Sequence, residues 1–369
     1  MVERANDGVG FSGHAGITLV ALVSRRQRRK GNLAIRVYHV DLREAQADPA
    51  LAALFARSDT SAPFDRLDWL RLLAETCFAQ GRCFLAVARE GDRIVALPLR
   101  ETAFGFAQLG NWYSFFIRPL GRDVDLLSAL AASLHRPLRL YPMLQEDAEA
   151  MAGALRSQGW LGNIEVCDFN YYCDITSSCF EDWWRARPGA LRATVRRKGR
   201  DCAVDLQVLS QFSDDAWDAY ETVYQRSWKP AEGNPAFLRR FAEAEGAAGA
   251  LRLGIARIDG EPVAAQFWTI EGGTAWIHKL AHDERHKARS PGTLLAQAMF
   301  SHAIDVDKVS RIDFGTGADA YKRDWMDAVR PLYRIEFHRL SSPSSWPRLA
   351  RLALRGWIKR PLVLPGSTG

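Results

Sequence analysis

A loop rich in basic residues, Arg-His-Lys-Ala-Arg-Ser-Pro-Gly-Thr, spans residues 285–293 between a predicted strand and a predicted helix. Gly292 permits close approach to the backbone, and the amides after it are unpaired donors of a helix N-terminus, where phosphate binds. The basic side chains add full positive charges. The loop is either a pyrophosphate cradle or an ordinary loop with a Pro-Gly helix start. The residues that would form the cradle are Arg289, Ser290, Pro291, Gly292, Thr293 and Leu294.

A carboxylate, Asp313, ends another predicted strand and is followed by Gly-Thr-Gly at 315–317. Catalytic groups favour the carboxyl ends of strands in open α/β sheets. The same carboxylate could equally cap the turn that the glycines form. Both interpretations of Asp313 stay open at this point.

Three histidines, His278, His282 and His286, are spaced by four residues, as metal ligands on a helix would be. Their segment is predicted to be a strand, and strand geometry places the three rings too far apart. The six cysteines contain no Cys-x-x-Cys pair, so we interpret them as reduced structural thiols. We therefore expect no metal.

The predicted elements occur in the same order in two halves of the chain, which indicates a duplicated α/β domain. Gly91-Asp92 and Asp259-Gly260 are hairpin signals in corresponding places. In the first half we predict strands at 83–90, 93–100 and 112–118, a helix at 125–134, a strand at 138–141, a helix at 146–158 and a strand at 164–175. In the second half we predict strands at 251–258, 262–270 and 274–281, a helix from 294 to about 306, a strand at 311–314, a helix at 318–326 and a strand at 332–340.

The composition is that of a globular protein with two domains: 369 residues, 47% hydrophobic and 25% charged. No run approaches the roughly 20 apolar residues that span a bilayer. Residues 1–30 and 341–369 carry +4 and +5 of the net charge of +6, which leaves −3 for the body between them. A slightly acidic body argues against a DNA-binding protein.

The two ends differ from the body. In residues 1–30 most basic residues follow the short apolar run, whereas a secretory signal places them before it, so a cytoplasmic protein with a disordered leader is expected. Residues 346–360 form an amphipathic basic pattern. It suits contact with an anionic membrane surface, at the inner face of the membrane, or packing on the body with the arginines facing water. We expect a leader at 1–34, domains at 35–178 and 179–340, and a tail at 341–369.

Four runs in the second half carry a family resemblance: Trp-Ile-His-Lys-Leu-Ala-His at 276–282, Ser-Pro-Gly-Thr-Leu-Leu at 290–295, Ile-Asp-Phe-Gly-Thr-Gly at 312–317 and Tyr-Lys-Arg-Asp-Trp at 321–325. Their order and spacing resemble the CelD-type acetyltransferase family, which belongs to the GNAT superfamily and is related to FemAB-type transferases. The resemblance covers roughly residues 180–340. It implies tandem GNAT-like domains, each a mixed twisted sheet flanked by helices.

The resemblance also implies an activity, the transfer of an acyl group, usually acetyl from acyl-CoA, to a primary amine. In that family the strand before the cradle polarises the thioester carbonyl and the helix N-terminus holds the pyrophosphate. These roles fall on residues 279–282 and 290–294. The family's cradle is richer in glycine than this one, which leaves aminoacyl-tRNA open as an alternative donor.

A base must take a proton from the amine during attack. Asp313, His282 and Tyr321 are the available groups, with Asp313 preferred, and Lys279 and Lys322 would bind acidic parts of the substrates. The acceptor would be an amine on a sugar, a lipid or a small metabolite, in polysaccharide or cell-envelope metabolism. The alternatives are a FemAB-like aminoacyl-tRNA-dependent transferase and a non-catalytic GNAT-like scaffold of polysaccharide synthesis.

Overall fold

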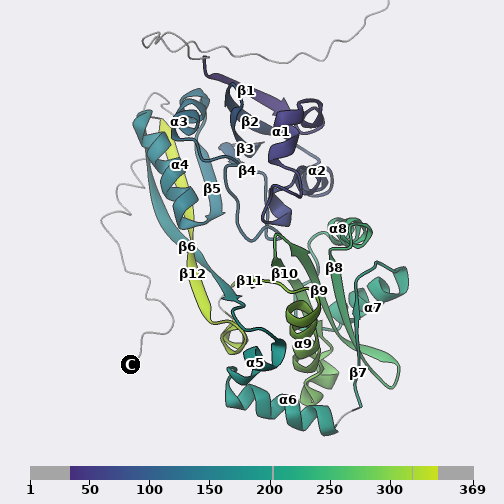
Figure 1. Cartoon of the computed structure of the whole chain (residues 1–369). Helices are drawn as coiled ribbons and strands as arrows, with labels where there is room; N and C mark the ends of the chain where they lie inside the picture. Colours follow the sequence, from purple (N-terminus) through teal and green to yellow (C-terminus); the bar gives the residue numbers. More distant parts are fainter. Residues whose placement is uncertain (1–33, 202, 318, 340–369) are drawn as a thin grey trace, which may run out of the picture.

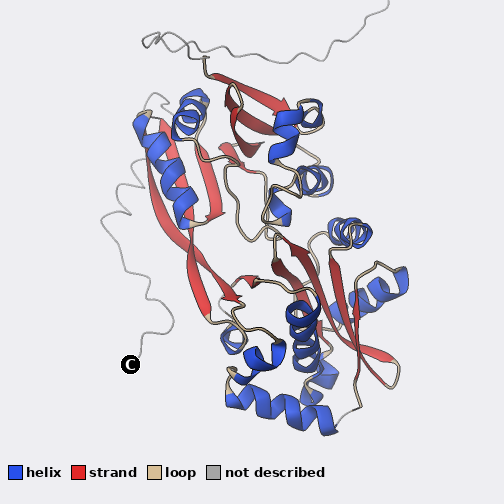
Figure 2. Cartoon of the chain, in the orientation of Figure 1, coloured by secondary structure: helices blue, strands red, loops and turns tan. Residues whose placement is uncertain are grey.

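The computed structural model describes residues 34–201, 203–317 and 319–339. They form a mixed α/β fold in which one 12-stranded sheet runs through the molecule with helices packed against it (Figures 1 and 2). The strand order is β1-β2-β3-β4-β5-β12-β6-β11-β10-β9-β8-β7. The predicted leader up to residue 33 and the tail from residue 340, with its membrane contact, lie outside the described residues. None of the described helices is long and apolar enough to span a membrane.

The first half contains every strand from β1 to β6. Its elements are β1 (Arg36–Asp41), η1 (Ala45–Ala47), α1 (Pro49–Leu54), η2 (Pro63–Asp65), α2 (Leu67–Thr76), β2 (Cys83–Glu90), β3 (Arg93–Thr102), β4 (Gly105–Gln108), α3 (Val124–Ser133), β5 (Leu138–Met143), α4 (Gln145–Ser157) and β6 (Trp160–Asp174).

The second half begins with two linking helices and then repeats this order. Its elements are α5 (Phe180–Arg185), α6 (Gly189–Asp201), β7 (Asp205–Leu209), α7 (Asp214–Gln225), α8 (Pro235–Ala247), β8 (Leu251–Ile258), β9 (Glu261–Glu271), β10 (Thr274–His282), η3 (Glu284–Arg289), α9 (Pro291–Ser301), η4 (His302–Val306), β11 (Arg311–Thr316), η5 (Ala320–Asp324) and β12 (Ala328–Arg339). The fold is therefore the expected tandem of GNAT-like α/β units.

The last strands of the two halves lie side by side at the centre of the sheet. β12 inserts between β5 and β6 and pairs antiparallel with β6 from Ala328↔Tyr172 to Arg339↔Trp160. β6 in turn pairs with β11. Because the sheet continues through both halves, the predicted domain boundary near residue 178 stays a prediction.

Several predicted elements need correction. Residues 112–118 are not a strand; they lie in a loop, and the strand that follows the hairpin of β2 and β3 is β4. Aromatic residues are typical of strands, which explains the wrong prediction. In this loop Tyr113, Phe115 and Phe116 are buried in the core without any strand pairing. The predicted helix at 318–326 is only the short 3₁₀ turn η5, and the helix predicted from 294 begins at Pro291.

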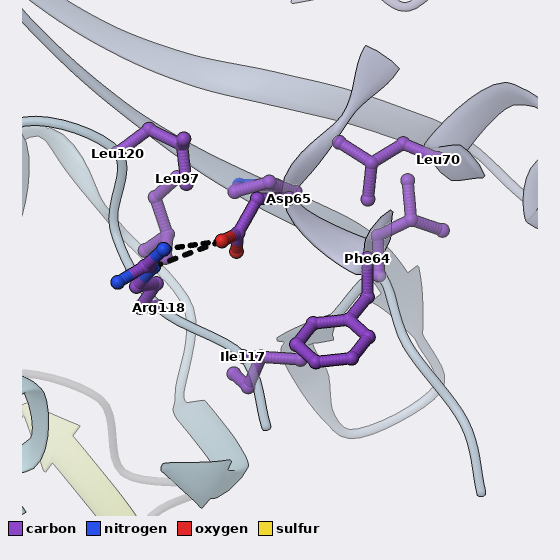
Figure 3. A pocket seen from close by; sticks show the side chains of 9 residues that line it. Phe64, Asp65, Leu70, Leu97, Ile117, Arg118 and Leu120 are labelled. Atoms are coloured by element: carbon purple, nitrogen blue, oxygen red, sulfur yellow. Dashed lines mark hydrogen bonds and ion pairs between the residues drawn. The ribbon is translucent and has the colours of Figure 1, made fainter. Parts of the chain in front are cut away.

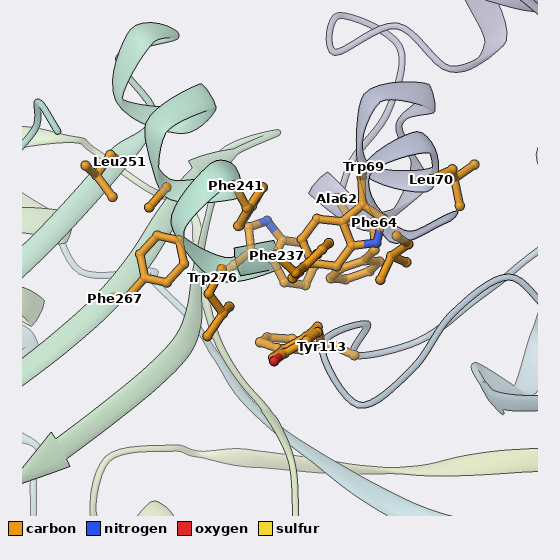
Figure 4. Close-up of a cluster of buried hydrophobic side chains, with 14 of the residues drawn as sticks. Ala62, Phe64, Trp69, Leu70, Tyr113, Phe237, Phe241, Leu251, Phe267 and Trp276 are labelled. Carbon is orange, nitrogen blue, oxygen red and sulfur yellow. The ribbon is translucent and has the colours of Figure 1, made fainter. Parts of the chain in front are cut away.

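The largest hydrophobic core lies between the two halves (Figure 4). Trp69 of α2 meets Phe237 and Phe241 of α8 edge to face, with ring centroids 5.0 and 4.7 Å apart. Tyr113 stacks on Phe237 at 4.8 Å. Aromatic pairs of this kind each stabilise by about 0.5–1.5 kcal/mol beyond the area they bury. This core fixes the loop that carries Tyr113 against the second half.

Four charged side chains join the halves beside this core; three are buried and that of Arg57 is 36% exposed. The guanidinium groups of Arg57 and Arg66 both contact the carboxylates of Glu245 and Glu271, at 2.6–3.1 Å. Thr60 adds a hydroxyl donor to Glu271 at 3.0 Å. Two cations thus face two buried carboxylates, and the exposed Asp68 lies 3.1 Å from Arg66 as a third.

A small cavity in the first half is lined by Asp65, Arg118 and apolar side chains (Figure 3). Its volume of about 10 Å³ holds at most one water molecule. Burial raises the pKa of Asp65, and the Arg118 guanidinium, which donates to it, opposes that rise. This ion pair is structural, because the cavity has no room for a substrate.

Candidate functional site

β10 and β11 separate after a short stretch of parallel pairing. Thr274–Trp276 pair with Arg311–Asp313, after which β10 runs on to His282 with β9 as its only neighbour among the described strands. β11 pairs with β6 on its other side, from Arg311↔Asp174 to Thr316↔Asn170, and does not follow β10 beyond Asp313. One edge of β10, from residue 277 to 282, is therefore left without a strand partner. Such an edge offers backbone donors and acceptors to an extended ligand.

A β-bulge changes the direction of the side chains at this point. Ile277 is opposite Trp268 and Lys279 is opposite Phe267, so His278 is the extra residue. Bulges of this kind re-aim side chains near functional sites. His278 packs among aromatic rings, and its Nε2 lies 2.8 Å from Thr269 Oγ1. Burial lowers the pKa of His278 to about 3, so its imidazole is neutral and structural.

Lys279 follows the bulge and belongs to a cluster that both halves form. Its Nζ lies 2.7 Å from Glu232 Oε2 and over the rings of Tyr113 and Tyr224, 4.9 and 5.5 Å from their centroids. The Tyr113 hydroxyl donates to Glu232 Oε1 at 2.6 Å. Burial lowers the pKa of Lys279, and the adjacent Glu232 opposes this effect. The loop of the first half thus orients a lysine at the free edge of β10.

His282 ends β10 beside the start of α9. A Cβ placed on Gly292 would lie 3.5 Å from His282 Nδ1, so the glycine faces the imidazole. The ring of Trp228 covers His282 at a centroid distance of 4.5 Å. His282 Nε2 lies 3.2 Å from Glu284 Oε1. Burial lowers the pKa of His282, which keeps the ring neutral at pH 7 and able to accept a proton.

The first turn of α9 has one free donor of the kind predicted for the cradle. Ser290 adopts a left-handed φ of 55° and Pro291 occupies the first helical position. The amides of Thr293 and Leu294 donate to the Ser290 carbonyl at 3.1 and 3.2 Å, whereas that of Gly292 has no partner among the described residues. Gln266 on β9 donates to the Gly292 carbonyl at 3.2 Å and holds this turn against the sheet.

The basic side chains of the loop differ in their availability. Arg285 pairs with Asp283 at 2.6 Å and Lys287 with Glu284 at 3.5 Å. Arg289 is exposed and forms no ion pair within the described part of the chain. It is therefore the cation of this loop that is free to meet an anionic ligand.

Asp313 is fully buried and all its contacts are internal. It accepts hydrogen bonds from Asn170 Nδ2 at 2.7 Å, the Gly315 amide at 2.9 Å and Arg330 Nη2 at 3.2 Å. The hydrogen bond from the Gly315 amide is the turn cap, which was one of the two interpretations of Asp313 from the sequence. Burial raises the pKa of Asp313, and the hydrogen bond from Asn170 opposes this effect most.

Tyr321 and Lys322 lie in η5. Lys322 is buried, donates to the Thr316 carbonyl and lies 3.7 Å from Asp319. The ring of Tyr321 is partly exposed and meets Phe314 edge to face at 5.6 Å. Burial raises the pKa of Tyr321, so its phenol is protonated at neutral pH.

The structure brings Lys279, His282 and Gly292 to the free edge of β10, while Asp313 lies inside the protein. Glu232, Lys229 and Trp228 were not predicted from the sequence, because they come from the irregular segment between α7 and α8 and carry no periodic signal. Tyr113 was hidden in a segment wrongly predicted to be a strand. The described residues contain no cluster of three or more His, Cys, Asp or Glu side chains that could hold a metal.

Comparisons with known proteins agree with this geometry. Residues 187–323 match the family described as an acetyltransferase (GNAT) domain. No curated protein sequence matches. The structure of FemX superposes with a TM-score of 0.58 at 9% identity, covering 85% of this chain and all of that one (100%).

Two further solved structures share the fold. The C-terminal domain of a putative lysylphosphatidylglycerol synthetase from Agrobacterium fabrum has a TM-score of 0.52 at 11% identity, covering 85% of this chain and 95% of that one. L-PGS from Bacillus licheniformis has a TM-score of 0.50 at 14% identity, covering 81% and 98%. With the separated strands, the bulge and the helix start in place, the second half carries the match to an acetyltransferase (GNAT) domain, and the chain is an acyltransferase.

Proposed function

We propose that the chain transfers an acyl group, acetyl in the first instance, from acyl-CoA to a primary amine. The observation that carries this proposal is the unpaired edge of β10 next to the free amide of Gly292. An extended pantetheine arm would add to that edge, and the pyrophosphate would lie at the start of α9 with Arg289 beside it. The acceptor would be an amine of a sugar, a lipid or a small metabolite of the cell envelope, reached in the cytoplasm.

In the reaction the amine nitrogen attacks the thioester carbon, the C–S bond breaks, and the amine loses a proton while the thiolate gains one. Of the three predicted bases, His282 is best placed, because it is neutral and lies at the edge of β10 beside Gly292. Glu284 would stabilise the imidazolium that forms. The ammonium of Lys279 has donors beyond the one directed at Glu232 and would stabilise negative charge on the carbonyl oxygen.

The donor site is tested by Gly292→Val. The branched side chain would fill the space in front of His282 and block close backbone approach, so we expect acetyl-CoA affinity to fall at least tenfold by calorimetry. Gly292→Ala is the matched control, because its Cβ makes only an ordinary contact at 3.5 Å. Unchanged affinity in the valine variant, with the fold intact by circular dichroism, would remove the cradle from this proposal.

A different test separates the candidate bases. Asp313→Asn places an amide NH₂ among three donors, so we expect the free energy of unfolding to fall by about 2–4 kcal/mol. We expect kcat of the folded protein to stay within about threefold of the wild-type value. His282→Gln should lower kcat by about 10²-fold, as expected for a lost general base. A loss of that size in Asp313→Asn at full folding would instead assign the base to Asp313.

One observation favours aminoacyl-tRNA as a second candidate donor. Helix α6 packs against α9 and exposes arginines that form no ion pair with other described residues: Arg196, Arg197 and Arg200. Leu191 and Val195 turn inward to the core. A thermal-shift screen of acetyl-CoA against aminoacyl-tRNA decides between the donors, because a bound donor raises the unfolding temperature. Stabilisation by the tRNA alone would replace acyl-CoA in the proposal.

A further inference from the structure

Lys229 is a partly buried lysine without a carboxylate of its own. It lies between α7 and α8, and its Nζ is 5.5 Å from the ring centroid of Trp228. No ion pair joins it to any residue that the structure describes. Since burying a charge is unfavourable unless it is paired, an unpaired ammonium at this depth needs an explanation.

The two lysines whose charges act on Lys229, Lys279 and Lys322, already have carboxylate partners. Glu232 pairs with Lys279 at 2.7 Å, and Asp319 lies 3.7 Å from Lys322. Burial lowers the pKa of Lys229 most, repulsion by Lys279 and Lys322 lowers it further, and attraction to Asp319 and Glu232 opposes these effects. Asp319 and Glu232 therefore act on Lys229 while they pair with Lys322 and Lys279, and Lys229 has no carboxylate of its own within ion-pair distance among the described residues.

The position of Lys229 relates it to the reaction. Trp228, the preceding residue, covers His282, and His282 faces Gly292 at the start of α9. Trp228 is 49% exposed, so part of its surface is open to a ligand beside His282. Lys229 thus comes directly after the residue that covers His282 and three residues before Glu232, the partner of Lys279.

We propose that Lys229 binds an anionic group of the acceptor, a carboxylate or a phosphate, and that Trp228 contacts the apolar part of the same molecule. The acceptor is then a primary amine that also carries an acidic group. This inference rests on the proposed acyl transfer, because it places the acceptor at the same site. A bound anion supplies the charge that the lysine cluster lacks, and a neutral amine leaves Lys229 unpaired.

Matched acceptors test the inference by turnover with acetyl-CoA. Phosphoethanolamine and β-alanine carry a phosphate and a carboxylate, and ethanolamine and propylamine are their neutral counterparts. For the wild-type chain we expect kcat/KM to favour the anionic amine at least tenfold. Lys229→Gln should lower that ratio at least tenfold, and Lys229→Arg should retain most of it. The pair with the larger ratio identifies the acidic group.

Calorimetric binding of phosphoethanolamine and β-alanine without donor gives a readout independent of turnover. We expect Lys229→Gln to weaken the better ligand at least tenfold. The control is Lys308→Gln, because Lys308 is exposed in the turn before β11, at the opposite end of β10 from His282. An unchanged ratio and unchanged binding in Lys229→Gln, or equal use of neutral and anionic amines by the wild type, overturns the inference. If neither kind of amine is acylated but anion binding still depends on Lys229, the proposed acyl transfer is wrong and the anion site is supported.

Discussion

Removal of Glu245 should lower the free energy of unfolding by about 3–5 kcal/mol. In Glu245→Ala the guanidinium of Arg66, whose side chain is only 3% exposed, keeps Glu271 as its buried partner, and Glu271 must then serve Arg57 as well. The two guanidinium groups would then have one buried carboxylate between them, and buried charges that lack a buried partner cause losses of this size. Urea denaturation monitored by tryptophan fluorescence measures the change.

The double variant Arg66→Met, Glu245→Leu sharpens this test. It removes one cation and one carboxylate together and leaves the Arg57–Glu271 pair at 3.1 Å, so we expect most of the lost stability to return. The control is Glu75→Ala. Its partner Arg240 also joins α2 to α8, at 2.9 Å, but both side chains are 52% exposed, so the loss should stay below about 1 kcal/mol. Equal losses for Glu245→Ala and Glu75→Ala would contradict the importance we give to burial.

The second large effect is expected on catalysis. Lys279→Met should lower kcat for acyl transfer by about 10²-fold, because it removes the ammonium that we assign to the carbonyl oxygen, and one donor of this kind contributes 10²–10³-fold. Lys279→Arg keeps the charge and should retain more activity. Steady-state kinetics at saturating acetyl-CoA, with the unfolding temperature measured beside it, separates a catalytic loss from unfolding.

Tyr113→Phe tests how the first half contributes to this lysine. The substitution removes only the hydroxyl that donates to Glu232 and accepts from the Asn234 amide. We expect a smaller fall in kcat, about tenfold, because Glu232 and Lys279 keep their contact. No change in either Lys279→Met or Tyr113→Phe would place the chemistry elsewhere in the molecule.

Local signals in the sequence predicted much of the fold. Asp259 and Gly260 take φ values of 52° and 83°, as a two-residue hairpin turn requires, and β8 has the predicted bounds. Gly159 has the positive φ of 75° expected after a helix. Each of these features depends on a few neighbouring residues, so the sequence pattern is sufficient to predict it.

The parts that were missed depend on distant residues. Glu232 gains its role from Tyr113, which lies 119 positions away along the chain. The Tyr113 hydroxyl also donates to the carbonyl of Asn234, 121 positions away. Asp313 looked accessible because it ends a strand, but Asn170 and Arg330 from two other strands enclose it. No pattern within one segment reports which other segment will cover it.

The central pairing of β12 with β6 has a consequence for biosynthesis. The first half is made long before residues 328–339 leave the ribosome, yet β5 and β6 are separated by β12 in the finished sheet. Until β12 is synthesised, β5 and β6 must therefore keep unpaired edges, or pair with each other and separate again when β12 inserts. Strand edges exposed in this way are prone to aggregation. A nascent chain stalled before residue 328 should thus be more sensitive to protease than the released protein.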